Sequence, residues 1–147
     1  MSNSDAIDIL LVEDNPEDVE LTLRSLERAR LTNPIHVVTD GAEALDFLFR
    51  TGQYKKRNEL GRPKVVLLDL KLPKVSGLEV LRRVKSDAST KTIPVVVLSS
   101  SREEPDIKEA YALGVNSDIV KPVDFEKFVG AVGQLGLYWL LLNQGPR

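Results

Sequence analysis

Four short apolar runs rich in β-branched residues stand out along the chain, each bounded by polar or turn-forming residues. They are IDILLV, IHVVT, VVLLDL and IPVVVL, and a shorter fifth run is DIV, at residues 7–12, 35–39, 65–70, 93–98 and 118–120. Runs of this length and composition predict β-strands. Three of the first four are almost continuously apolar rather than alternating, which is typical of strands buried on both faces of a parallel sheet.

The segments between these runs carry apolar residues at steps of three and four, which predicts amphipathic helices. The first is expected to begin at Asn15, a favourable N-cap followed by Pro16 at the first helical position. In all, the pattern predicts helices over residues 15–30, 41–50, 77–86, 105–114 and from Asp124 past Trp139. Alternating strands and helices indicate an α/β fold: a flavodoxin-like, doubly wound parallel sheet of five strands in the order 2-1-3-4-5, a (βα)5 chain with an extended C-terminal helix.

Length and composition are those of one domain, which we place at residues 7–136, after a polar N-terminus (1–6) expected to be disordered and before an apolar helix extension and tail (137–147). The 147 residues include no cysteine and one histidine, which excludes disulfides and metal sites built from cysteines or several histidines. With 20 basic and 22 acidic residues, the chain has no charge excess that would favour nucleic acid. Its apolar runs fall short of the ~20 residues of a membrane span, and its start lacks a basic export signal, so we expect a cytoplasmic protein that contacts no membrane.

Acidic residues follow two strands that should be neighbours in this sheet. Glu13 and Asp14 come after the first strand, and Asp69 ends the third. Because the carboxyl ends of parallel strands meet at one edge of the sheet, the three carboxylates should converge and repel one another. A divalent cation would relieve that repulsion, and an all-oxygen ligand set suits Mg²⁺, or Mn²⁺.

A hydroxyl and an ammonium group end the two remaining strands at the same edge. Ser99 follows the fourth strand and Lys121 follows the fifth. Beside a metal-bound carboxylate, these groups would bind a phosphoryl group, with Asp69 as its nucleophile. Ser100 is the alternative donor, and we favour Ser99 because it comes directly after the apolar strand.

The motifs at these strand ends together resemble the receiver domain of two-component response regulators (the CheY-like family). They are LLVED, LLDLKLPKVSG, VVVLSS and VKP, at residues 10–14, 67–77, 95–100 and 120–122, and the resemblance extends over residues 7–135. It implies a phosphoprotein that takes a phosphoryl group from a sensor histidine kinase and catalyses its own phosphorylation and dephosphorylation, rather than an enzyme with a separate substrate.

The same resemblance assigns a role to individual residues. It implies that Asp69 is the phosphoacceptor and that Ser99 and Lys121 contact the phosphoryl group. It implies that Mg²⁺ is held by the carboxylates of Glu13, Asp14 and Asp69 and by the backbone carbonyl of Lys71. A cis peptide bond is expected before Pro122, where it would direct Lys121 into the pocket.

Two segments narrow the resemblance to single-domain regulators paired with bacterial phytochrome-type histidine kinases. They are the long loop before the third strand and the apolar sequence QLGLYWLLLN, at residues 52–64 and 134–143. Since only a helix and a short tail are expected after Asp124, we expect no DNA-binding output domain. Output would then pass through phosphorylation-dependent protein contacts or a phosphorelay.

Two features depart from, or add to, the family pattern. Asp118 occupies the position, three residues before the lysine, at which receivers usually carry an aromatic switch residue. Because burying an aspartate is costly, we expect Asp118 to stay outward and to make polar contacts on the fifth-strand face. The last helix should be apolar on all sides near its end, which predicts a symmetric homodimer through that helix and the adjoining fifth-strand face. The alternative is a helix that folds back on its own domain.

Two other functions fit the same fold. A flavodoxin or nucleotide-binding enzyme would need a phosphate-cradling loop after the first strand, but the loop here is EDNPED, which would repel a phosphate without a metal. A degenerate receiver that only binds proteins would need no intact pocket, whereas all five pocket positions carry suitable side chains.

Overall fold

The computed structural model describes residues 8–28, 33–55, 62–101, 104–115 and 117–137. Its centre is a sheet of five parallel strands in the order β2-β1-β3-β4-β5, as predicted. The strands are β1 (Ile9–Val12), β2 (Ile35–Val38), β3 (Val65–Asp69), β4 (Val95–Ser99) and β5 (Ser117–Val120). Every residue of β1, β3 and β4 is buried, which explains their nearly unbroken apolar sequences.

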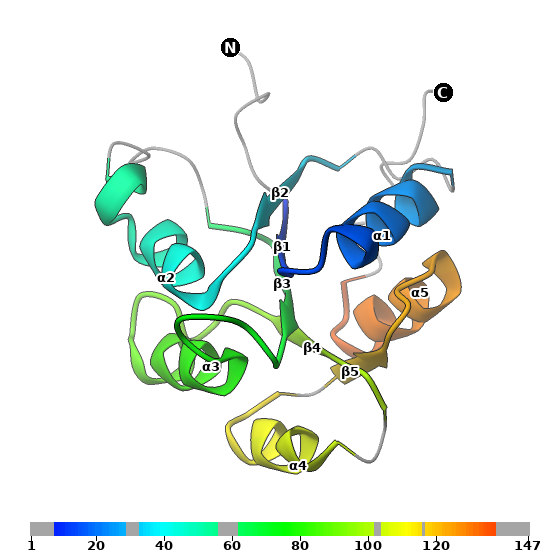
Figure 1. Ribbon diagram of the computed structural model, residues 1–147. Coiled ribbons are helices and arrows are strands. Elements are labelled where there is room, and N and C mark those ends of the chain that lie inside the picture. Colours follow the sequence, from blue (N-terminus) through cyan, green and yellow to red (C-terminus); the bar gives the residue numbers. More distant parts are fainter. Residues whose placement is uncertain (1–7, 29–32, 56–61, 102–103, 116, 138–147) are drawn as a thin grey trace.

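Helices cover both faces of this sheet (Figure 1). Helices α1 and α5 lie on one face, and α2, α3 and α4 lie on the other. Their bounds are α1 (Pro16–Arg28), α2 (Gly41–Phe49), α3 (Gly77–Ser86), α4 (Pro105–Ala112) and α5 (Phe125–Gln134), with a 3-10 turn, η1 (Gly52–Tyr54), after α2. Among the described residues, no helix is both long and apolar enough to cross a membrane.

Side chains of the central strands alternate between two cores, one on each face. Leu10 and Val12 of β1 pack with α2 and α3, whereas Ile9 and Leu11 pack with α1 and α5. Phe128 of α5 is fully buried in the second core. Helices therefore pack against both faces of the sheet, and this packing fixes the carboxyl ends of its strands relative to one another.

Helix α5 ends earlier than the sequence predicts. The prediction that it runs past Trp139 is wrong, because the helix stops at Gln134 and Gly136 adopts a left-handed backbone with φ of 73°. The amide of Leu137 donates to the carbonyl of Val132 at 2.8 Å and that of Gly136 to Gly133 at 3.1 Å, the two hydrogen bonds of a Schellman ending. Apolar residues continue beyond this stop, so apolar periodicity alone predicts a longer helix. The expectations for residues 1–6 and for the tail after Leu137 lie outside the described residues.

Strand β5 forms one edge of the sheet, and side chains from both flanking helices contact it. The ammonium of Lys127 in α5 donates to the backbone carbonyls of Val120 at 2.9 Å and Pro122 at 3.2 Å. Asp118 is half-buried and accepts a hydrogen bond from the hydroxyl of Tyr111 in α4. This is the kind of polar contact expected for Asp118, and its orientation in a phosphorylated state stays a prediction.

Candidate functional site

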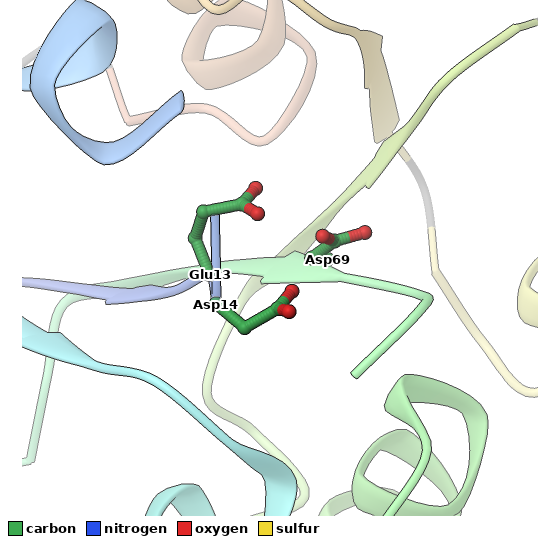
Figure 2. A group of neighbouring side chains, drawn as sticks. All are labelled: Glu13, Asp14 and Asp69. Atoms are coloured by element: carbon green, nitrogen blue, oxygen red, sulfur yellow. The ribbon is translucent and has the colours of Figure 1, made fainter. Parts of the chain in front are cut away.

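Three carboxylates meet where β1 and β3 end. One carboxylate oxygen from each of Glu13, Asp14 and Asp69 lies within 4.8 Å of the others, and Figure 2 shows the three side chains at the ends of the neighbouring strands. The register explains this meeting, because Val12 pairs with Leu68 and the acidic residues follow directly. Glu13 is 1% exposed and Asp69 4%, whereas Asp14 is exposed to solvent. Two of the three charges therefore lie in a buried setting that requires compensation.

Lys121 supplies that compensation from the end of β5. Its ammonium donates to Glu13 Oε1, Asp18 Oδ2 and Asp69 Oδ2, each at 3.1 Å. The peptide bond between Lys121 and Pro122 is cis, as predicted. Burial lowers the pKa of Lys121, but the hydrogen bond to Asp18 and the charge of Asp69 outweigh that effect and raise it. The lysine is thus held as a cation among three anions.

Glu13 shows the cost of this crowding. Burial raises the pKa of Glu13, and repulsion by Asp69 raises it further, whereas the hydrogen bond from the amide of Asn15 lowers it. The resulting pKa is about 7, against an ordinary value of 4.5. The cation Lys121 offsets only part of this effect. A further positive charge at this point would therefore be bound favourably.

The loop after β4 brings two serines and a glutamate to the same place. Ser99 is buried, and its hydroxyl has no hydrogen-bond partner among the described residues. Ser100 donates to Glu104 Oε1 at 3.1 Å, so its hydroxyl is already engaged. This difference favours Ser99 over Ser100 as the group free to bind a ligand.

The side chain of Lys71, two residues after Asp69, reaches from the end of β3 to the loop after β4. Its ammonium lies 3.1 Å from Glu104 Oε2, in an ion pair whose lysine side chain is 69% exposed and whose glutamate side chain is 4% exposed. The hydrogen bond to Glu104 and the negative charge of that side chain raise the pKa of Lys71. The amide of Lys71 donates to Asp69 Oδ1 at 3.1 Å and so orients that carboxylate.

These side chains surround a cavity of about 210 Å³. Its lining includes every residue with a predicted role at the phosphoryl group or the metal, namely Glu13, Asp14, Asp69, Lys71, Ser99 and Lys121. Four hollows among the described residues are larger, of about 470, 480, 350 and 240 Å³, and the first two lie over α1 and between β5 and α5. None of the four gathers the acidic cluster, the lysine and the buried serine together, so the smaller cavity is the candidate site.

The donor set fits a hard divalent cation. Three carboxylates that can approach one point supply the oxygen ligands preferred by Mg²⁺ and Mn²⁺. The raised pKa of Glu13 indicates that Lys121 does not fully neutralise the negative charge there. The role of the Lys71 carbonyl as a further ligand stays a prediction.

Sequence reasoning missed two residues that line the cavity, Asp18 and Glu104. Asp18 lies in the first turn of α1, where acidic residues commonly stabilise a helix N-terminus. That role accounts for an aspartate at this position, so its contact with Lys121 was not expected. Glu104 directly precedes Pro105 at the start of α4. A signal for Asp18 was its place three residues after the N-cap Asn15, which directs its side chain back toward the strand ends.

Comparisons with known proteins agree on one family. Residues 9–133 match the family described as response regulator receiver domain. The chain is 41% identical over 138 residues to the probable methanogenesis regulatory protein FilR2 of Methanothrix harundinacea, covering 94% of this chain and 86% of that protein. It is 36% identical over 132 residues to the response regulator Rcp1 of Synechocystis, covering 90% and 88%.

Solved structures give the same answer. The bacteriophytochrome response regulator AtBRR superposes with a TM-score of 0.86 at 56% identity, over 95% of this chain and 99% of that one. The Mn²⁺-bound form of Rcp1 superposes with a TM-score of 0.73 at 35% identity, over 96% and 99%. Fold, strand-end residues and relatives lead to one conclusion: this chain belongs to the response regulator receiver domain family.

Proposed function

We propose that this protein accepts a phosphoryl group on Asp69 from a sensor histidine kinase. The observation that carries the proposal is the ammonium of Lys121, held 3.1 Å from Asp69 Oδ2 in a cavity that also contains the buried, unpartnered hydroxyl of Ser99. A carboxylate oxygen of Asp69 attacks phosphorus, the phosphorus–nitrogen bond of the phosphohistidine breaks, and the imidazole leaves with a proton from solvent. Water later attacks the same phosphorus and releases inorganic phosphate.

The side chains act by positioning and by charge. Lys121 and Ser99 donate hydrogen bonds to the phosphoryl oxygens, and the amide of Lys71 orients Asp69. Glu13, Asp14 and Asp69 would hold Mg²⁺, or Mn²⁺ as in the Rcp1 structure, which when bound neutralises charge on the transferring group. The protein is thus a phosphoacceptor that catalyses its own phosphorylation and dephosphorylation, and no separate substrate is turned over.

Incubation with acetyl phosphate and Mg²⁺, followed by intact mass, tests this proposal. We expect the wild-type chain to gain one phosphoryl group and Asp69→Asn to gain none. Glu126→Gln, which removes an acidic residue from the exposed start of α5, is the control and should be labelled as the wild type is. Labelling of Asp69→Asn at the wild-type rate would refute the assignment, and an unlabelled wild type would favour a protein-binding module.

The partner we propose is a phytochrome-type histidine kinase, with signalling through phosphorylation-dependent contacts or a phosphorelay in the cytoplasm. Support comes from the bacteriophytochrome response regulators AtBRR and RtBRR, which are 56% and 55% identical to this chain. Phosphotransfer from a phosphorylated phytochrome-type kinase should be at least about tenfold faster than from an unrelated kinase, because matched surfaces raise the association rate. Equal rates from both kinases would refute this pairing.

We also propose a homodimer that uses the β5–α5 face and the C-terminal residues. The support is the apolar sequence of residues 137–142 together with the hollow of about 480 Å³ between β5 and α5. Light scattering at micromolar concentration tests it, with and without a phosphate mimic. A chain that stays monomeric in both conditions, and is unchanged by removal of residues 137–147, would refute it.

A further inference from the structure

Among the described residues, Asp18 is the partner of Lys121 that lies outside the acidic cluster. Its Oδ2 accepts a hydrogen bond from the Lys121 ammonium at 3.1 Å, the same distance as those to Glu13 and Asp69. The cluster with cation-binding geometry comprises Glu13, Asp14 and Asp69 and does not include Asp18. Of the three carboxylates around Lys121, Glu13 and Asp69 are therefore also candidate metal ligands, whereas Asp18 is not.

The first turn of α1 holds Asp18 in place for this contact. The side chain of Asn15 accepts hydrogen bonds from the amides of Glu17 at 2.8 Å and Asp18 at 3.1 Å, which anchors the backbone there. The amide of Asn15 itself donates to Glu13 Oε2 at 3.1 Å, so the Asp18 carboxylate is not needed to cap it. The carboxylate, 30% exposed, turns to Lys121 instead.

A cation bound to the cluster would share the carboxylates of Glu13 and Asp69 with Lys121. Lys121 donates to one oxygen each of Glu13 and Asp69, and two positive charges on shared carboxylates repel each other. A phosphoryl group bonded to one oxygen of Asp69 would offer its own oxygens to the Lys121 ammonium as further acceptors. With a cation bound, Lys121 has to stay beside Asp69 against this repulsion, and Asp18 is a partner of Lys121 that the cation-binding cluster does not include. With a phosphoryl group present, the contact with Asp18 holds the ammonium where it can donate to the phosphoryl oxygens.

We infer that Asp18 is a positioning residue that retains the Lys121 ammonium beside Asp69 while metal and phosphoryl group occupy the rest of the site. The part that concerns phosphorylation rests on the proposed function, whereas the part that concerns metal binding does not. Burial lowers the pKa of Lys121, and the hydrogen bond to Asp18 is the largest single contribution that raises it.

Asp18→Asn tests the inference, with Glu17→Gln as the matched control. Both changes remove one negative charge from the exposed first turn of the same helix, but Glu17 does not contact Lys121 in the described structure. Without the Asp18 charge, Lys121 pairs more strongly with Glu13 and Asp69 and competes better against a cation. We expect Asp18→Asn to weaken Mg²⁺ binding about tenfold and to slow phosphorylation by acetyl phosphate about tenfold, the scale of one charge-assisted hydrogen bond, and Glu17→Gln to change each less than about twofold.

A double-mutant cycle separates this role from a direct charge effect on the metal. In a Lys121→Ala background, Asp18→Asn should weaken Mg²⁺ binding no more than Glu17→Gln does, because the lysine that Asp18 retains is gone. An equal loss with and without Lys121, or equal losses for Asp18→Asn and Glu17→Gln, would overturn the inference. Thermal unfolding checks that each variant is folded. If the wild type takes up no phosphoryl group, the proposed function fails, and the Mg²⁺ cycle still decides the role of Asp18.

Discussion

The acid–base behaviour of Glu13 predicts that Mg²⁺ binding depends on pH near neutrality. Burial, together with repulsion by Asp69, raises the pKa of Glu13 to about 7. Only the ionised carboxylate is a metal ligand, so binding Mg²⁺ below pH 7 must displace a proton. Raising the pH therefore strengthens binding until Glu13 is ionised throughout.

The size of the effect follows from that pKa. With a pKa of about 7, Glu13 is ionised in about one molecule in eleven at pH 6 and in about ten of eleven at pH 8. If one proton is displaced per ion bound, apparent Mg²⁺ affinity falls about tenfold from pH 8 to pH 6. The raised pKa of Glu13 has the opposite effect on the stability of the metal-free fold, which decreases as pH rises. Between pH 4.5 and about 7 the folded chain retains a proton that the unfolded chain releases, so this group makes the free energy of unfolding fall as pH rises.

Isothermal titration calorimetry with Mg²⁺ at pH 6, 7 and 8 measures the first effect. Repeating each titration in two buffers of different ionisation enthalpy counts the protons released. Glu13→Gln is the control, because it removes the titrating group and should bind more weakly with nearly the same affinity at pH 6 and 8. Wild-type affinities that agree within about twofold across this range would refute the reasoning.

Other predictions concern packing around the site. Phe128 is fully buried in the core beneath α5, so Phe128→Ala should lower the free energy of unfolding by about 3–5 kcal/mol, and a loss below 1 kcal/mol in urea denaturation would contradict this burial. A Cβ on Gly77 would lie 2.2 Å from the carbonyl oxygen of Asp69, so Gly77→Ala should destabilise the fold and slow the labelling of Asp69 by acetyl phosphate. Gly130 in α5 has nothing within 4 Å of such a Cβ, and Gly130→Ala should stabilise the fold by up to about 1 kcal/mol without slowing labelling. Equal stability and equal labelling rates for the two glycine variants would show that the close approach of Gly77 to Asp69 does not matter.

Most of the fold could be predicted because local and long-range signals agree. Helix α3 has the predicted bounds, since Ser76 accepts a hydrogen bond from the amide of Glu79 and caps a regular apolar stripe. Strands β1, β3 and β4 are recognisable because burial on both faces leaves them almost purely apolar. The end of α5 could not be predicted from apolar periodicity alone, because the left-handed Gly136 stops the helix although apolar residues continue beyond it.

The candidate site was predictable to the extent that its residues end strands. Parallel strands place their carboxyl ends together, so Glu13, Asp69 and Lys121 could be grouped from topology alone. Asp18 and Glu104 come instead from a helix turn and a loop, whose side-chain directions depend on how those segments pack. Their contacts emerge only when the tertiary structure is known.

The lysine contact at the outer edge of β5 limits how another protein can use this face. The outward carbonyl of Val120 and the carbonyl of Pro122 are both engaged by Lys127. An extended peptide that tried to add a sixth strand here would find its first acceptors occupied by an ammonium group. The contact therefore makes strand addition at this end of β5 less favourable than recognition through side chains and helix surfaces.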